Sequence, residues 1–278
     1  MNRPKITVNC LATNEESWIW YAINSVLEYV DEIIVWSHGS TDMTDSLLSS
    51  TKSPKLKYKR TVDANQANFT IYRQQMLDQT DADWLMILDG DEIWPDTNIR
   101  KTVKFIYDQG QNYEFLIHPY YNLVGDVFHY QDEAAGKYRI GQHQGHITTR
   151  FINLKKISGL HYERGHGQIG LFDQQNTLIQ DRKPFEAKFL DLPYMHTTHL
   201  HRSSLDYTVS KRPRKFKYEI GTQFPENFAY PSTFYKSVPV SIASPWQRPN
   251  FSYWLQSLWQ TPIRYLKRRL FESEKHGY

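Results

Sequence analysis

Residues 84–92 read WLMILDGDE, an apolar run that is followed at once by three carboxylates. An almost wholly apolar run of this length is typical of a strand covered by helices on both faces. In open α/β sheets the ligand crevice lies at the carboxyl ends of the strands, which is where Asp89 and Asp91 stand. Paired oxygen ligands there suit Mg²⁺ or Mn²⁺ bound with a substrate's phosphates. An Asp-x-Asp alone is also typical of an acidic loop that caps a helix, so the surrounding sequence has to decide.

Apolar runs and helical patterns alternate on the N-terminal side of this strand. We predict strands at residues 6–11, 33–36 and 57–60, and helices at 16–29, around 47–48 and at 69–77. This alternation predicts a parallel, doubly wound sheet. After about residue 110 helices become scarce, and strands are expected at 113–124 and 146–154.

Composition excludes several classes of protein. Cys10 is the only cysteine among 278 residues, so an intrachain disulfide is excluded and a cysteine-based zinc site is not expected. The net charge is +3, and the basic excess lies in residues 246–278, which leaves the folded body near neutral. A nucleic-acid partner is therefore not expected. No apolar run approaches a membrane span, and the N-terminus lacks a signal-like core, so we expect a cytoplasmic or peripheral protein.

Four segments resemble, in order, the sequence blocks of family-2 glycosyltransferases. They are ITVNCLATNEE (6–16), VDEIIVWSHGSTDMTD (30–45), NFTIYRQQMLDQTDADWLMILDGDEIWP (68–95) and TTRFINLKKISGLHYERGHG (148–167). The resemblance implies a GT-A fold, which is a Rossmann-like, doubly wound mixed sheet. It also implies a nucleotide-diphospho-sugar donor and a divalent cation, Mn²⁺ or Mg²⁺.

The resemblance further assigns roles to individual residues. Asp91 would bind the metal that holds the diphosphate, and Asp89 would approach the ribose or the metal. The family often has an acid where this chain has Ser37-His38, which leaves the nucleotide base open. The remaining donor-binding positions would be Thr13, Asn14 and Glu15 around the nucleoside, Asp42 in the turn beneath it, and Arg73 near the nucleotide.

Two later clusters supply a base and a further metal ligand. Glu163 is our candidate general base, with His161 as its partner or as a sugar-binding group; the alternative is a surface ion pair with Arg164. Rival acids are Asp132, Glu133 and Asp191. For the metal, related enzymes often supply a late histidine. We choose His199, with His196 and His201 as alternatives, against the simpler reading of ordinary strand histidines.

We divide the chain into a GT-A domain at 1–220, a Pro-rich extended linker at 221–250 and a basic amphipathic tail at 251–278. The first half of the domain (1–110) would bind the nucleotide and the second (111–220) the acceptor. In the tail, apolar residues recur at helical spacing from Phe251, and Thr261-Pro262 is expected to start a second helical piece. Aromatic and basic residues around an apolar stripe suit an anionic membrane surface, whereas the alternative is a helix packed on the domain.

Together these features predict an inverting, metal-dependent glycosyltransferase. It would move a sugar to a hydroxyl of a glycan or lipid-linked acceptor in cell-surface polysaccharide or glycolipid synthesis, at the inner face of the plasma membrane. A nucleotidyltransferase would show a Gly-rich basic loop after the first strand, which LATNEE is not. The other alternative is a non-catalytic nucleotide-sugar or carbohydrate-binding protein of the same fold.

Overall fold

The computed structural model describes residues 3–61, 65, 68–165, 168–183, 186–200, 216–239, 241–270 and 275–276. The α-helices are α1 (Ile19–Val26), α2 (Thr44–Ser50), α3 (Phe69–Asp78), α4 (Asp96–Gln109) and α5 (Phe251–Leu270). The strands of the first half are β1 (Ile6–Ala12), β2 (Glu32–His38), β3 (Leu56–Thr61), β4 (Trp84–Ile87), β5 (Glu92–Ile93) and β6 (Phe115–Val124). Those of the second half are β7 (His129–Tyr130), β8 (Tyr138–Ile140), β9 (His143–Gly145), β10 (Ile147–Asn153), β11 (His161–Glu163), β12 (Gly170–Phe172), β13 (Ala187–Phe189), β14 (Tyr194–His199), β15 (Thr222–Gln223) and β16 (Lys275–His276).

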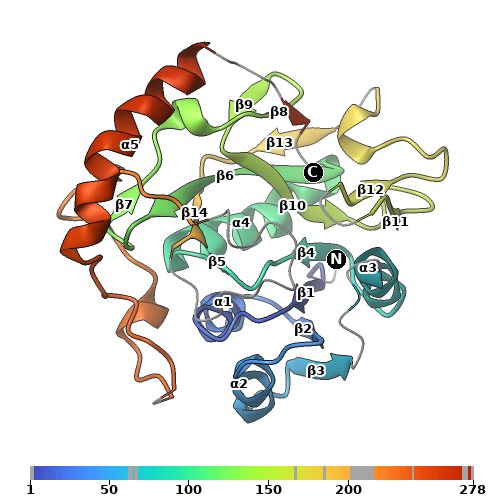
Figure 1. The fold of residues 1–278 in the computed structure, drawn as a ribbon. Helices are drawn as coiled ribbons and strands as arrows, with labels where there is room; N and C mark the ends of the chain where they lie inside the picture. Colours follow the sequence, from blue (N-terminus) through green and yellow to red (C-terminus); the bar gives the residue numbers. More distant parts are fainter. Residues whose placement is uncertain are drawn as a thin grey trace.

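One large mixed sheet organises the chain, with its main path in the order β3-β2-β1-β4-β10-β6-β7-β15 (Figure 1). The four strands β3, β2, β1 and β4 are parallel, whereas β10 runs antiparallel to both β4 and β6. The predicted α/β, doubly wound mixed sheet is confirmed. Its parallel part comprises the four strands that the sequence predicts before residue 90.

Helices cover the parallel strands on both faces, as their apolar sequences require. Every residue of β1 and β4 is buried. On one face, Val8 and Val35 pack in the main core with residues of α1, α2 and α4. On the other face, Ile34 and Trp36 pack against Met76 of α3. The carboxyl ends of β1, β2 and β4 therefore meet at one edge of the sheet.

Two helices differ from expectation. The helix expected at 16–29 is shorter, spanning Ile19–Val26, because residues 13–18 form the turn that leaves β1. Helix α4 was not predicted. Its signals are Pro95 immediately before it, Asp96 in its first turn, and the buried positions Ile99, Val103 and Ile106 at helical spacing.

The segment 221–250 packs on the domain. Phe224, Phe234 and Ile242 are buried in the same core as β1 and α1. The ring of Phe234 lies edge-on to Tyr21 of α1, with 5.5 Å between the centroids. The prolines give this segment an extended course, but its aromatic side chains form part of the main core.

Helix α5 is one continuous helix that contains Pro262, so the expected start of a second piece at Thr261 is wrong. Proline removes a single backbone donor from the helix, and packing against the domain holds the helix across that gap. The Thr261 hydroxyl instead accepts a hydrogen bond from the backbone N–H of Ile220, at 2.8 Å. In Figure 1, α5 runs along the outside of the molecule next to β7.

Polar groups of α5 face the domain. Tyr253 and Ser257 are buried, and the guanidinium of Arg268 makes two hydrogen bonds, of 2.5 and 2.8 Å, to the carboxylate of Glu219. Glu219 is itself buried. Exposed apolar residues of the helix are Phe251, Leu255, Leu258, Trp259, Ile263, Leu266 and Leu270. Helix α5 therefore turns polar groups toward the domain and apolar side chains outward, whereas an amphipathic surface helix usually packs its apolar stripe on the core.

We predict that Phe234→Ala destabilises the whole protein by about 3–5 kcal/mol, as for a large aromatic residue removed from a core. The neighbouring change Tyr235→Ala is the control, because Tyr235 is 69% exposed. It should cost less than about 1.5 kcal/mol, the upper value for an aromatic pair. Urea unfolding followed by far-UV circular dichroism measures both. Equal, small losses in the two variants would show that residues 221–250 are a linker after all.

Candidate active site

Asp89 lies at the end of β4 between two arginines. Arg73 of α3 donates to its Oδ1 at 2.8 Å, and Arg150 of β10 donates to its Oδ2 at 3.1 Å. Burial alone would raise the pKa of Asp89, but the charges of Arg150 and Arg73 outweigh it and hold that pKa below its ordinary value. Asp89 is therefore ionised at neutral pH. Both of its carboxylate oxygens are engaged by cations of the chain.

Arg150 also pairs with the carboxylate of Glu92, which is fully buried. The other oxygen of Glu92 accepts a hydrogen bond from the backbone N–H of Asp89, at 3.2 Å. The two carboxylates and the two arginines thus form one ionic cluster that fixes the turn after β4, in which Arg150 and Glu92 are buried and Arg73 and Asp89 are partly exposed. Neither Arg150 nor Glu92 is among the site residues predicted from the sequence. Their signal was a lone arginine in an apolar strand and a carboxylate beside Asp91.

Asp91 is buried and faces strand β14. Its Oδ2 lies 3.4 Å from Nε2 of His196. Its backbone oxygen accepts hydrogen bonds from the N–H and the hydroxyl of Thr197, at 2.9 and 3.2 Å. Between them Asp91 and His196 present a carboxylate oxygen and an imidazole nitrogen, which is a donor pair suited to Mn²⁺.

His199 lies elsewhere. Its Nε2 is 2.8 Å from Nζ of Lys217 and 3.1 Å from Nδ2 of Asn122. A register shift in β14 between His196 and His199 separates the two histidines. His201 lies outside the described residues. Within the part of the chain that the structure describes, no group of three His, Cys, Asp or Glu side chains is placed to hold a metal ion, so Asp89, Asp91 and His199 are not brought together as one site.

The turn after β1 is built around Asn14, which has φ +50°, a left-handed conformation that asparagine tolerates. Its side-chain oxygen accepts from the backbone N–H of Thr41, at 2.7 Å. Thr13 donates to the carbonyl of His38, at 2.9 Å, so this turn is tied to the end of β2. Asp42 caps the same assembly by accepting from the N–H of Glu16, at 3.1 Å. The structure therefore places Thr13, Asn14 and Asp42, which were predicted to bind the nucleotide-sugar, at one edge of the sheet.

Glu15 connects this turn to the carboxylates. A Cβ on Gly90 would lie 2.9 Å from the Cγ of Glu15, so the close approach of the two segments favours glycine at position 90. Arg73, Asp89 and Glu15 thus converge on the ends of β1 and β4.

His38 ends β2 at the place where the family often has an acid. It is buried, and its ring packs against Tyr72 and Phe69, with centroids 4.9 and 5.2 Å away. Its Nδ1 lies 3.1 Å from the hydroxyl of Thr61. The departure from the family pattern is accommodated by an aromatic environment.

Glu163 and His161 lie two positions apart on β11 and contact each other, with 3.3 Å between Oε1 and Nε2. The alternative partner of Glu163, Arg164, lies instead over the ring of Phe172, 4.7 Å from the centroid. Strand alternation directs Tyr162 away from this pair, and burial raises the pKa of Tyr162 although the nearby Arg73 opposes that rise. The rival acid Asp132 caps a short turn by accepting from the N–H of Ala134.

A parallel 3-2-1-4 sheet that continues into antiparallel strands, with Asp-x-Asp at the end of its central strand, defines a GT-A fold. The family model described as glycosyl transferase family 2 matches residues 10–173, which is more than half of the chain. The chain belongs to glycosyl transferase family 2. Among curated proteins no match is found.

Three solved structures illustrate the likeness. TarS 1–349 of S. aureus is 16% identical, with 70% of this chain and 60% of that chain covered and a TM-score of 0.47. The mannosyltransferase PcManGT from Pyrobaculum calidifontis, in complex with GDP-Man and Mn²⁺, is 15% identical over 71% and 58%, with a TM-score of 0.45. Glucosyl-3-phosphoglycerate synthase from Mycobacterium tuberculosis, in complex with Mn²⁺, UDP and glucosyl-3-phosphoglycerate, is 21% identical over 44% and 45%, with a TM-score of 0.32. This chain spans less than two thirds of each.

We predict that Arg150→Met costs about 3–5 kcal/mol of folding stability, because it leaves the buried Glu92 without its cation. The matched control is Arg60→Met, which breaks an ion pair with Asp45 in which the arginine is 60% exposed. An exposed pair contributes at most about 1 kcal/mol. Chemical denaturation at neutral pH compares the two. A loss no larger in Arg150→Met than in Arg60→Met would contradict the ionic-cluster interpretation.

Proposed function

We propose that this protein is an inverting, metal-dependent glycosyltransferase that transfers a sugar from a nucleotide-diphospho-sugar to a hydroxyl of a glycan or lipid-linked acceptor. The observation that carries the proposal is the edge where Asp89, Arg73 and Arg150 form an ionic cluster beside Asp91. Family membership supports the reaction class. The donor pocket would be formed by Thr13, Asn14, Glu15, Asp42 and Arg73, together with Asp89.

The cation would be held by Asp91, and His196 is the histidine placed beside it. When bound with the donor's diphosphate, a divalent cation neutralises the charge of the leaving group. Asp89 would then approach the ribose, with its orientation fixed by Arg73 and Arg150. That His199 binds the metal stays a prediction. A comparison of the single variants His196→Ala and His199→Ala decides between the two histidines.

For an inverting transfer, a base must take the proton of the acceptor hydroxyl on the face opposite the leaving group. We propose Glu163 for this role, with His161 as its partner. Support comes from the 3.3 Å contact between the two side chains and from the partial exposure of Glu163, which leaves its carboxylate accessible.

The acceptor would be reached at a membrane surface. Seven apolar residues along α5 are exposed, and so are Lys267 and Arg269 in its last turn. Such a helix can lie in the interface of an anionic bilayer, where each basic residue contributes about 1 kcal/mol. Within the described residues, no helix is both long enough and apolar enough to span a bilayer. We therefore propose peripheral attachment at the cytoplasmic membrane face, in polysaccharide or glycolipid synthesis.

Binding of a nucleoside diphosphate should require both a divalent cation and Asp91. We expect UDP or GDP with Mn²⁺ to raise the melting temperature of the wild type by mass action, and EDTA or Asp91→Asn to abolish that rise. His196→Ala should behave like Asp91→Asn, whereas His199→Ala should retain the response. If His199→Ala abolished the rise in melting temperature and His196→Ala retained it, His199 would be the metal ligand instead. Full transfer activity in EDTA would contradict metal dependence.

Glu163→Gln should lower turnover by about 10²-fold or more, because it keeps the shape of the side chain and removes the base. Affinity for the donor should stay unchanged, since the base faces the acceptor. Steady-state transfer to a panel of free and lipid-linked glycans measures turnover, with Glu226→Gln, which changes an exposed glutamate outside the site, as the matched control. If Glu163→Gln transfers normally, the role passes to Asp132, Glu133 or Asp191.

The exposed face of α5 should determine membrane binding. We expect the wild type to co-sediment with vesicles of phosphatidylglycerol and phosphatidylcholine, and the double variant Trp259→Glu with Leu266→Glu to stay in the supernatant. The control is Tyr235→Glu, which charges an exposed aromatic residue outside α5. Equal sedimentation of the double variant and the wild type, or none by either, would exclude α5 as the anchor.

A further inference from the structure

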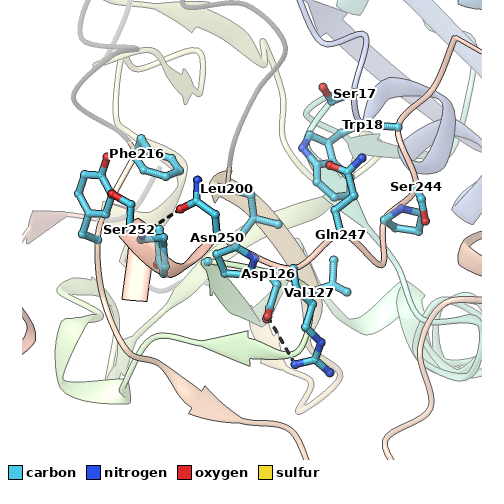
Figure 2. A pocket seen from close by; sticks show the side chains of 17 residues that line it. Ser17, Trp18, Asp126, Val127, Leu200, Phe216, Ser244, Gln247, Asn250 and Ser252 are labelled. Carbon is cyan, nitrogen blue, oxygen red and sulfur yellow. Dashed lines mark hydrogen bonds and ion pairs between the residues drawn. The ribbon is translucent and has the colours of Figure 1, made fainter. Parts of the chain in front are cut away.

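A cavity of about 380 Å³ lies where α1, the loop after β6 and the chain before α5 meet (Figure 2). Its volume is in the range of small-molecule sites. It is lined by Trp18 and Asp126 on the domain side and by Gln247, Arg248 and Asn250 on the other. The residues from 243 onward come from segments that the sequence analysis placed in a linker and a tail.

Asp126 presents an open acceptor to this cavity. Its side chain is fully buried, and its Oδ1 accepts from the N–H of Phe128 at 2.9 Å and lies 2.6 Å from Nδ1 of His129. Its Oδ2 is buried and has no hydrogen-bond donor among the described residues. The guanidinium of Arg248 is 3.9 Å from that oxygen, which is close enough for an ion pair but beyond hydrogen-bond distance.

Trp18 presents an open donor. The residue is 7% exposed, and no described residue accepts a hydrogen bond from its indole N–H. A buried donor or acceptor without a partner costs about 1–3 kcal/mol, so two of them on one cavity indicate that something else supplies the hydrogen bonds. The side-chain amides of Gln247 and Asn250 offer further polar groups.

The cavity wall also carries aromatic rings. Phe216, Tyr218 and Tyr253 line it together with Trp18. A ligand that fits must therefore offer both hydroxyl groups, which can donate to a carboxylate and accept from an indole N–H, and apolar C–H faces that contact rings. A sugar ring has this combination, whereas a lipid chain lacks the hydroxyls and a phosphate lacks the apolar C–H faces.

We propose that this cavity is a binding site for a sugar ring, with Asp126 accepting from one hydroxyl and Trp18 donating to another. Trp18 follows Glu15, which contacts Gly90, so the cavity adjoins the donor edge. This assignment rests on the proposed function: the bound sugar is then the acceptor, so the group that receives the transferred sugar is a hydroxyl of a sugar. The chain before α5 thus contributes to substrate choice.

The test uses the full-length protein labelled with ¹⁵N in its tryptophans. The indole N–H signal of Trp18 is identified by its absence in Trp18→Phe. Methyl glycosides of glucose, galactose, mannose and N-acetylglucosamine are the probes. We expect at least one of them to shift the Trp18 signal saturably. Asp126→Asn, which keeps the oxygen used by Phe128, should weaken binding of that glycoside at least tenfold, whereas Asp108→Asn, at an exposed position of α4, should not.

The proposal is overturned if none of the four glycosides shifts the Trp18 signal, or if Asp126→Asn and Asp108→Asn bind the glycoside equally. UDP and GDP with Mn²⁺ are titrated into the same samples. Glycoside binding without any sugar transfer would contradict the proposed function and leave the sugar site standing. Transfer at the wild-type rate by Asp126→Asn would contradict the sugar site and leave the proposed function standing. A tenfold preference for octyl over methyl glycosides would identify the sugar as lipid-linked, and equal binding as part of a free glycan.

Discussion

The contact on which the site depends is the one between Arg150 and the carboxylates of Asp89 and Glu92. Each terminal nitrogen of a guanidinium carries two N–H donors, so one nitrogen can contact two carboxylates. Here Nη2 of Arg150 on antiparallel β10 contacts both carboxylates at the end of parallel β4. It joins the two halves of the sheet at the point where the chain leaves the strand, and so the position of the Asp-x-Asp turn is determined by a charge interaction between distant segments.

This arrangement separates the roles of the two aspartates. Asp89 is held by cations of the chain itself and is ionised as a result. Asp91 turns toward β14, where its Oδ2 lies 3.4 Å from Nε2 of His196. Because both oxygens of Asp89 already accept hydrogen bonds from arginines, we propose Asp91 as the principal ligand of an external cation.

Residues 221–270 attach to this domain by two unlike means. Residues 221–250 bury aromatic rings in the main core, while α5 attaches through hydrogen bonds and the ion pair between Arg268 and Glu219. Burial would raise the pKa of Glu219, but the pairing with Arg268 lowers it below its ordinary value, so the carboxylate stays charged at neutral pH. Because this helix uses its polar groups for attachment, its apolar groups are left exposed. The same chain segment closes the cavity around Asp126, which places the exposed helix and the proposed sugar site next to each other.

The sequence by itself determined the parallel half of the sheet, because apolar runs and helical spacing are local properties of the chain. It also determined which edge carries the candidate site residues, since polar residues follow β1, β2 and β4 in the sequence. Only the tertiary structure decided which side chains meet. Arg150 lies 61 residues from Asp89, a register shift separates His196 from His199, and Asp126 shares its cavity with Trp18 and Arg248, each more than 100 positions away. Such contacts depend on strand register and packing, which periodicity in a single sequence does not encode.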